Sequence, residues 1–326
     1  MIRQKYFLYC FLLIFIASCG GGGGSSSSDS PEPTPSPPVS EPSENCVYYS
    51  ANTERCSLIH KGLDRYYLIY TPTTITNNDE APILFALHGY GSSAETHKSY
   101  TMHEPFANTN KTIVVYAQGY KLETAFTSSS SHWNVGAWTI GSTVDDIDFI
   151  DTIIDLIDDK ATINKNRIYS SGMSNGGFMS YNLACNLSSK IAAVISVTGS
   201  FSAEMLEDCN PEHPTPVMQI HGALDPTVPF NGNSALGMVP IETTLEFWSD
   251  YNLCNSVPDI RIIDFIDLGM SVEHKTYKDC QNNVQVELLK SSGMPHTWPS
   301  ESNYGIDATK EIWSFINQYD LSGKVD

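Results

Sequence analysis

The sequence is short of positive charge. It has 18 lysine and arginine residues against 37 aspartate and glutamate residues, which gives a net charge of −19 at pH 7. Because proteins bind the phosphates of nucleic acids through basic side chains, this balance argues against a nucleic-acid partner. The acidity is compatible with high solubility and identifies no partner by itself.

Long apolar segments are also lacking. The run from Tyr6 to Ala17 is too short to span a bilayer comfortably, but with Arg3 and Lys5 before it the run is typical of a signal peptide. It leads into IASC, which resembles a bacterial lipobox, so we expect cleavage before Cys19 and a lipid on its thiol. An ordinary secretory signal followed by an incidental cysteine is the alternative. Either reading predicts an exported protein, and the first anchors it to the outer membrane or cell surface.

Apolar side chains are almost absent from residues 20–44, which read GGGGGSSSSDSPEPTPSPPVSEPSE. Such a segment buries too little surface to offset the entropy lost on ordering, so we expect a flexible Gly/Ser coil followed by an extended proline-rich spacer. No second linker or internal repeat is visible in the sequence. We therefore divide the chain into a signal peptide (1–18), a disordered linker (19–45), one globular domain (46–320) and a short tail (321–326).

The cysteines lack the C-x2-C spacing of structural zinc sites, which argues against bound metal. Cys10 would leave with the signal and Cys19 would carry the lipid, so six cysteines remain. Six thiols in an oxidising compartment favour three disulfides, although fifteen pairings are possible. We expect neighbours in the sequence to pair: Cys46–Cys56, Cys185–Cys209 and Cys254–Cys280.

The globular part alternates between strand-like and helix-like runs. Short runs typical of buried strands occur at residues 83–87, 112–116, 167–171, 191–197, 216–221 and 284–289. Helical spacing of apolar residues occurs at 143–161, 177–185, 241–251 and 307–319. Thr143 is the expected N-cap of the first helix, with Asp145 and Asp146 in its first turn. This alternation predicts an α/β fold with a mostly parallel sheet, in which reactive groups lie at the carboxyl ends of the strands.

One of these strand ends carries the motif G-x-S-x-G, as GMSNG from Gly172 to Gly176. Alone it is weak evidence, because chance supplies it in roughly one chain of this length in ten. A strand-like run precedes it and a helix-like run follows, which is the context of a nucleophile elbow. The two glycines would make room for the tight turn that holds the serine clear of the backbone. We therefore predict Ser174 as a nucleophile.

A serine nucleophile needs a base and an acid, which are expected in the chain order Ser, Asp, His. His296 lies late in the chain in a Gly- and Pro-containing loop and is our candidate base, with His274 as the rival. Asp225 directly follows a predicted buried strand and would orient the imidazole, although Asp at such a place can simply cap a turn. Asp208 and Asp250 follow no predicted strand and are weaker candidates.

The oxyanion formed during acyl transfer needs two N–H donors. We expect them from the backbone of Asn175, after the nucleophile, and of Tyr90, in the HGYG loop after an earlier strand. His88 in that loop is interpreted as structural. Three tryptophans are candidates to line a substrate pocket, with burial in the core as an equally good alternative: Trp133, Trp138 and Trp298.

Five motifs together resemble a known family. They are HGYG, VDDIDFIDTIIDLI, RIYSSGMSNGGFMSYNLAC, HGALDPTVPFNG and PHTWP, and they cover most of residues 65–300. Their order is similar to that of the α/β-hydrolase esterases grouped as polyhydroxybutyrate depolymerases and feruloyl or acetylxylan esterases. The resemblance implies an α/β-hydrolase fold and a triad of Ser174, Asp225 and His296. It also supports the pairings Cys185–Cys209 and Cys254–Cys280.

The sequence thus predicts a membrane-tethered serine esterase that needs no metal or organic cofactor. Its expected substrates are hydroxyalkanoate esters or oligomers, or feruloyl and acetyl esters of plant polysaccharides. Many depolymerases of the resembled family carry an added binding domain that is not seen here, so we expect attack on soluble oligomers or plant-wall esters. A serine peptidase of the same fold and an inactive glycan-binding lipoprotein are the alternatives.

Overall fold

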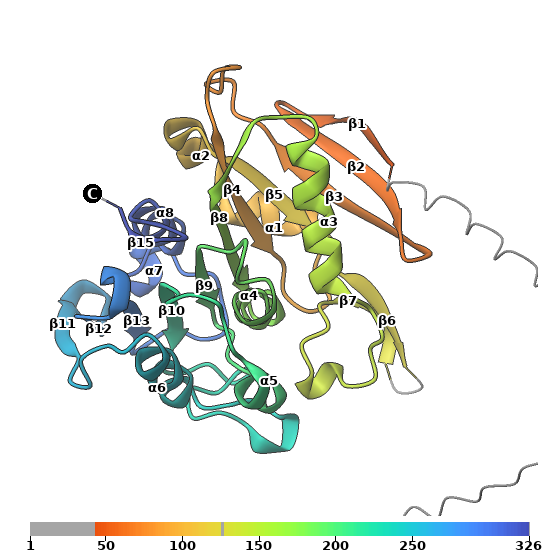
Figure 1. Ribbon diagram of the computed structural model, residues 1–326. Helices are drawn as coiled ribbons and strands as arrows, with labels where there is room; N and C mark the ends of the chain where they lie inside the picture. Colours follow the sequence, from red (N-terminus) through yellow and green to blue (C-terminus); the bar gives the residue numbers. More distant parts are fainter. Residues whose placement is uncertain (1–42, 125–126, 326) are drawn as a thin grey trace, which may run out of the picture. The chain divides into compact units, whose positions relative to one another are not determined.

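The computed structural model describes residues 43–124 and 127–325 (Figure 1). The expected signal peptide, the lipidation site Cys19 and nearly all of the expected linker lie outside these residues. Within the described ranges, none of the helices is both long enough and apolar enough to cross a membrane.

The centre of the described domain is one eleven-stranded sheet in the order β1-β2-β3-β5-β4-β8-β9-β10-β13-β12-β11. The six strands from β5 to β13 run parallel to one another, and antiparallel strands flank them at both edges. The strands of this sheet are β1 Glu44–Ser50, β2 Thr53–His60, β3 Leu63–Tyr70, β4 Ala81–Leu87, β5 Ile113–Ala117, β8 Ile163–Met173, β9 Ala193–Val197, β10 Val217–Gly222, β11 Asp259–Phe265, β12 Met270–Tyr277 and β13 Val286–Ser291.

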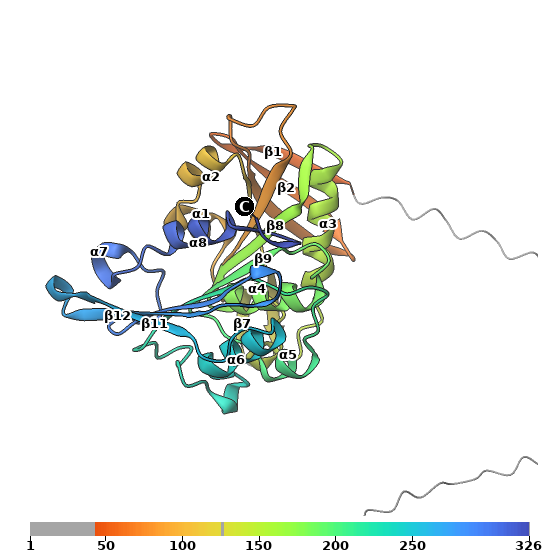
Figure 2. The same cartoon turned by 60° about the vertical axis from the view of Figure 1, so that its left-hand side comes forward.

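Helices cover both faces of the sheet, because the central strands are apolar on both sides (Figure 2). Along β4, Phe85 packs into the core beneath α3, α4 and α6, whereas Leu84 packs into the core beneath α1, α2 and α8. The helices are α1 Ala94–Thr101, α2 Glu104–Asn110, α3 Asp146–Asp158, α4 Asn175–Asn186, α5 Ala203–Asp208, α6 Ile241–Tyr251, α7 Glu301–Tyr304 and α8 Ala308–Ile316.

Two hairpins lie outside the large sheet. Strands β6 (Tyr120–Thr124) and β7 (Thr127–His132) pair with each other after β5. Strands β14 (Tyr319–Asp320) and β15 (Gly323–Lys324) pair with each other near the end of the chain. The last hairpin continues into the expected tail, and β1 begins inside the expected linker, so the folded domain is slightly longer than predicted at both ends.

The expected strands and helices are all present to within a few residues, but the start of α3 differs from the prediction. Asp145, and not Thr143, is its N-cap, and the Asp145 carboxylate accepts a hydrogen bond from the Asp148 N–H at 3.1 Å. Asp146 is buried in an ion pair with Arg65 at 2.7 Å and is not a solvated first-turn acid. A tertiary partner from β3 therefore fixes the local geometry of this helix start.

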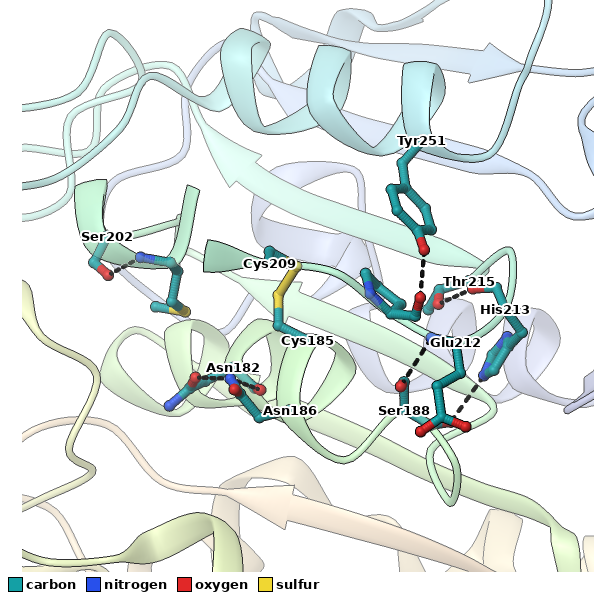
Figure 3. Close-up of a disulfide and its surroundings, with 12 residues drawn as sticks. Asn182, Cys185, Asn186, Ser188, Ser202, Cys209, Glu212, His213, Thr215 and Tyr251 are labelled. Atoms are coloured by element: carbon teal, nitrogen blue, oxygen red, sulfur yellow. Dashed lines mark hydrogen bonds between the residues drawn. A yellow bond between two sulfur atoms is a disulfide. The ribbon is translucent and has the colours of Figure 1, made fainter. Parts of the chain in front are cut away.

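The six cysteines of the domain form the three expected disulfides: Cys46–Cys56, Cys185–Cys209 and Cys254–Cys280. Figure 3 shows the second of these, which joins α4 to the end of α5. The segment after it is tied down as well, since the Glu212 N–H donates to Ser188 Oγ at 3.0 Å and the Tyr251 hydroxyl donates to the Pro211 carbonyl. These links hold the chain that follows α5 against the ends of α4 and α6.

Candidate active site

Ser174 occupies the turn between β8 and α4. Its backbone φ of 55° and ψ of −121° lie in a region that residues other than glycine rarely adopt. This strained backbone geometry is typical of a nucleophile elbow. The Ser174 N–H donates to the Val197 carbonyl at 2.8 Å, and its carbonyl accepts from the Gly177 N–H at 2.8 Å. Neighbouring strand β9 and the first turn of α4 therefore hold the serine in place.

The two glycines of the motif are required by close backbone packing. A Cβ on Gly172 would lie 2.2 Å from the Gly176 carbonyl oxygen, and a Cβ on Gly176 would lie 2.1 Å from the Leu87 carbonyl oxygen. Both distances are far below van der Waals contact, so larger residues would push α4 away from β8 and β4. The motif thus reflects how tightly the elbow packs onto the end of β4.

Asp225 and His296 are hydrogen-bonded although they are 71 residues apart in the sequence. His296 Nδ1 lies 2.7 Å from Asp225 Oδ2, while Asp225 Oδ1 accepts from the N–H groups of Thr227 at 2.8 Å and Val228 at 2.9 Å. Because a carboxylate only accepts, this contact assigns the imidazole proton to Nδ1 and leaves Nε2 as the basic atom. Burial alone would raise the pKa of Asp225, but the hydrogen bonds from His296, Val228 and Thr227 outweigh it and hold that pKa below its ordinary value.

One cavity reaches both His296 and the residue that precedes Ser174. His296 lines it together with Met173, the residue just before Ser174. Among the described residues Ser174 Oγ has no hydrogen-bond partner, and nucleophile–base hydrogen bonds are often loose until substrate binds. The rival histidine, His274, is placed elsewhere: it lies on β12 and contacts Glu287 at 2.8 Å.

His221 is a neighbour of the pair that the sequence had not singled out. It is fully buried, its Nε2 donates to the Val228 carbonyl at 2.9 Å, and its Nδ1 accepts from Gln219 at 2.9 Å. Burial lowers the pKa of His221 to about 4, so it stays neutral and adds no charge 3.6 Å from Asp225 Oδ2. Its role is to support the turn that carries the carboxylate.

The HGYG loop follows β4 and lies against Ser174. A Cβ on Gly89 would be 3.4 Å from Ser174 Cβ, which places the loop backbone beside the serine. His88 is fully buried, with Nε2 accepting from the Gly119 N–H at 2.9 Å and Nδ1 donating to the Gly89 carbonyl at 2.8 Å. Burial lowers its pKa to about 4, so a neutral His88 shapes the loop, and the N–H groups of Tyr90 and Asn175 stay the predicted oxyanion donors.

Trp133 links this loop to the elbow and is not exposed to a substrate. It is fully buried, and its indole N–H donates to the His88 carbonyl at 2.9 Å. The Asn175 side chain completes the link by accepting from the Trp133 N–H at 2.7 Å and donating to the Trp133 carbonyl at 3.1 Å. The prediction of a substrate contact for Trp133 is therefore corrected, because hydrogen bonding and packing already use its whole side chain.

The other two candidate tryptophans differ in position. Trp138 is half-buried and packs edge-on against Phe178, with 4.8 Å between the ring centroids. It does not line the cavity beside His296. Trp298 lines that cavity, and its indole N–H donates to Thr309 Oγ1 at 3.2 Å. The rings of buried His97 and His103 both pack edge-on against the Trp298 ring. The ring centroids lie 5.6 Å apart for His97 and 6.0 Å apart for His103. These contacts hold the Trp298 ring at the cavity wall.

The cavity beside His296 has a volume of about 530 Å³ and is predominantly apolar, and we call it the apolar cavity. Its size lies in the range of small-molecule sites in proteins. It opens between α1, α2 and the loop that carries His296, and its largest side chains are those of Tyr100, Met102, Phe106, Met173 and Trp298. An apolar group of a substrate bound at Ser174 would be accommodated here.

Comparison with known proteins agrees with this geometry. A model of the phospholipase/carboxylesterase family matches residues 73–245, which include β4, the HGYG loop, the elbow and Asp225. The chain belongs to this family. The matched residues end before His296, whose role is inferred from its hydrogen bond to Asp225.

Relatives of this phospholipase/carboxylesterase chain include two enzymes of fungi. It is 25% identical over 265 residues to the bifunctional acetylxylan esterase/xylanase XynS20E of Neocallimastix patriciarum, and 26% identical over 266 residues to feruloyl esterase B of Piromyces equi. The matches cover 81% and 79% of this chain but only 35% and 46% of those proteins.

A solved structure supports the α/β-hydrolase fold of this family member. The acetyl xylan esterase from Aspergillus awamori superimposes with a TM-score of 0.52 over 77% of this chain and 94% of that one, at 14% sequence identity. At this low identity the likeness concerns the fold. It agrees with the parallel central sheet and the helices on both its faces.

Proposed function

We propose that this protein is an exported serine esterase that hydrolyses feruloyl or acetyl esters of plant polysaccharides. The observation that carries the proposal is the 2.7 Å hydrogen bond between His296 and Asp225, because His296 lines a cavity with Met173, the residue before Ser174 in the elbow. Membership of a carboxylic-ester hydrolase family and the names of the two fungal relatives support it.

In this proposal Ser174 Oγ attacks the ester carbonyl carbon while His296 Nε2 takes its proton. Asp225 stabilises the resulting imidazolium, and the N–H groups of Asn175 and Tyr90 hold the oxyanion. The C–O bond to the alcohol then breaks, and the alcohol leaves with the proton from His296. Water repeats the sequence on the acyl-enzyme, which releases the acid and restores the Ser174 hydroxyl.

The apolar cavity favours an aromatic acyl group over acetyl. Its volume of about 530 Å³ far exceeds what an acetyl methyl group would fill, and its walls include the rings of Tyr100 and Trp298. Aromatic groups gain from burial against apolar walls and from ring contacts. A feruloyl group bound there would place its carboxyl end toward Ser174 and His296.

We also propose that the enzyme acts outside the cytoplasm while anchored by a lipid on Cys19. Three disulfides indicate folding in an oxidising compartment. The partners of the protein are then an ester substrate and the membrane that holds the lipid. Labelling cells with a radioactive fatty acid tests the anchor, since the label should appear on the wild type and be lost in Cys19→Ser.

The activity is tested with purified protein whose disulfides have formed. The substrates are methyl ferulate, p-nitrophenyl acetate, hydroxybutyrate oligomers and a p-nitroanilide peptide, and the matched variant is Ser174→Ala. We expect turnover of methyl ferulate that falls by roughly 10³-fold or more in the variant, because the covalent route is lost. Wild-type turnover no faster than that of Ser174→Ala would contradict the proposal that the protein is an esterase. Faster turnover of the hydroxybutyrate oligomers or of the peptide than of methyl ferulate would show that the proposed substrate class is wrong.

A further inference from the structure

A second cavity lies next to the HGYG loop, and we call it the polar cavity. It has a volume of about 770 Å³. Five segments from β3, the loop before α1, the β5–β6 connection, β7 and the loop before α3 line it: residues 63–66, 91–93, 118–121, 130–132 and 141–144. The mechanism proposed above uses none of its side chains.

The polar cavity is within reach of an ester bound at Ser174. A Cβ on Gly89 would lie 3.4 Å from Ser174 Cβ, and Gly91, two residues later, lines the cavity and donates its N–H to the Ser131 carbonyl at 2.8 Å. Two residues of chain span at most about 7 Å. The cavity wall at Gly91 therefore lies no more than about 7 Å from Gly89, a distance that the alcohol part of a sugar ester can span.

The lining suits a neutral, hydroxyl-rich ligand. Apart from Leu63 and Val144, its side chains carry hydroxyl, amide, imidazole or charged groups, or are absent at glycine. The buried charge of Arg65 is matched by Asp146 at 2.7 Å, so the cavity has no strong preference for an anion. Half-buried Tyr120 adds a ring with a hydroxyl, which is suited to the apolar face and the hydroxyls of a sugar.

Arg65 also has hydrogen-bonding capacity that the protein does not use. The residue is 3% exposed, and its Nη2 donates to Asp146 Oδ1 at 2.7 Å and to the Gln118 carbonyl at 3.1 Å. Its Nε and Nη1 are buried and have no hydrogen-bond partner among the described residues. The Arg65 guanidinium carbon lies 3.8 Å from the centre of the Phe149 ring, so an aromatic face covers this buried cation and the wall of the cavity is fixed from behind.

We propose that the polar cavity binds the neutral sugar residues that carry the ester. This inference rests on the proposed function and deepens it, since it assigns the acyl group to the apolar cavity and the glycan to the polar cavity. The HGYG loop lies between them and holds the reacting carbonyl. The cavity then determines selectivity for glycan esters and leaves the chemistry at Ser174 unchanged.

The test compares two esters of the same acid. Kinetics are measured on a feruloylated xylo-oligosaccharide and on methyl ferulate, with wild type, Tyr120→Ala and Thr143→Trp, the last of which fills the rim of the cavity. Tyr48→Ala is the matched control, because Tyr48 is 79% exposed on β1 and lines neither cavity. Loss of a ring contact and a hydrogen bond predicts about a tenfold drop in kcat/KM on the oligosaccharide ester for Tyr120→Ala.

On methyl ferulate we expect both cavity variants to stay within about twofold of the control, which also shows that they fold. Equal losses on both esters, or no loss on either, would overturn the sugar site and leave the esterase standing. If wild type hydrolyses neither ester, the proposed function fails, and titration of xylohexaose into Ser174→Ala by calorimetry decides the cavity alone. Binding that Tyr120→Ala weakens would support a sugar site, and absence of binding would overturn it.

Discussion

Replacing Asn175 by alanine should destabilise the fold, because two buried hydrogen bonds are lost. The Asn175 side chain is fully buried and pairs with both the N–H and the carbonyl of Trp133, which in turn holds the His88 carbonyl. Asn175→Ala leaves that N–H and that carbonyl buried without partners. The two loops that meet behind Ser174 would then lose their direct connection.

The magnitude follows from the number of unpaired groups. Each buried donor or acceptor left without a partner costs about 1–3 kcal/mol, so the loss of two partners should lower the free energy of unfolding by about 2–6 kcal/mol. For a domain of this size that corresponds to a decrease in Tm of roughly 5–15 °C. Because Asn175 also supplies a backbone N–H beside Ser174, kcat on p-nitrophenyl acetate should fall together with Tm.

The assay is thermal denaturation followed by circular dichroism, with esterase kinetics at a temperature where both proteins are folded. Asn186→Ala is the matched control, because Asn186 is exposed at the other end of the same helix, α4. The reasoning is refuted if the free energy of unfolding of Asn175→Ala lies within about 1 kcal/mol of that control, since the two hydrogen bonds would then contribute no more than a surface substitution does.

Two further predictions concern charge. Asp225→Asn should lower kcat on p-nitrophenyl acetate by about 10³–10⁴-fold, because the amide no longer holds the His296 tautomer, and a kcat within tenfold of wild type would disprove the assignment. Stability should also fall in mild acid: burial lowers the pKa of His88 and His221 to about 4 and of His103 to about 3, below the ordinary 6.5. The unfolded chain then binds more protons, so stability is complete above pH 6.5 and declines toward pH 4, by up to about 1.4 kcal/mol per pH unit for each histidine. Urea denaturation at pH 7.5 and 5.0 measures this, and equal free energies of unfolding would contradict it.

The sequence points to Ser174, Asp225 and His296 as candidates because each follows a strand of the parallel sheet. Parallel strands end at the same edge, so residues after different strands come together even when they are far apart in the chain. Here β8, β10 and β13 deliver the three residues, and the structure joins Asp225 to His296 directly. Strand runs that are apolar on both faces are among the clearest signals in a sequence of this class.

Residues that act through tertiary contacts were not predictable in the same way. Trp133 in a polar loop has no periodic pattern to show that it is buried, and the sequence favoured a substrate contact and a core position equally. The side-chain role of Asn175 and the partner of Asp146 depend on loops and strands that meet only in the folded chain. The polar cavity has five separate segments in its walls, so no local motif marks it.

The apolar and polar cavities have no lining residue in common. The HGYG loop and the elbow therefore separate substitutions in one cavity from substitutions in the other. Free-energy effects of substitutions that share no contacting residue usually add. Selectivity for the acid and selectivity for the alcohol can then diverge separately in related enzymes. In this arrangement a single catalytic centre can be adapted to many pairs of acid and alcohol by changing one wall at a time.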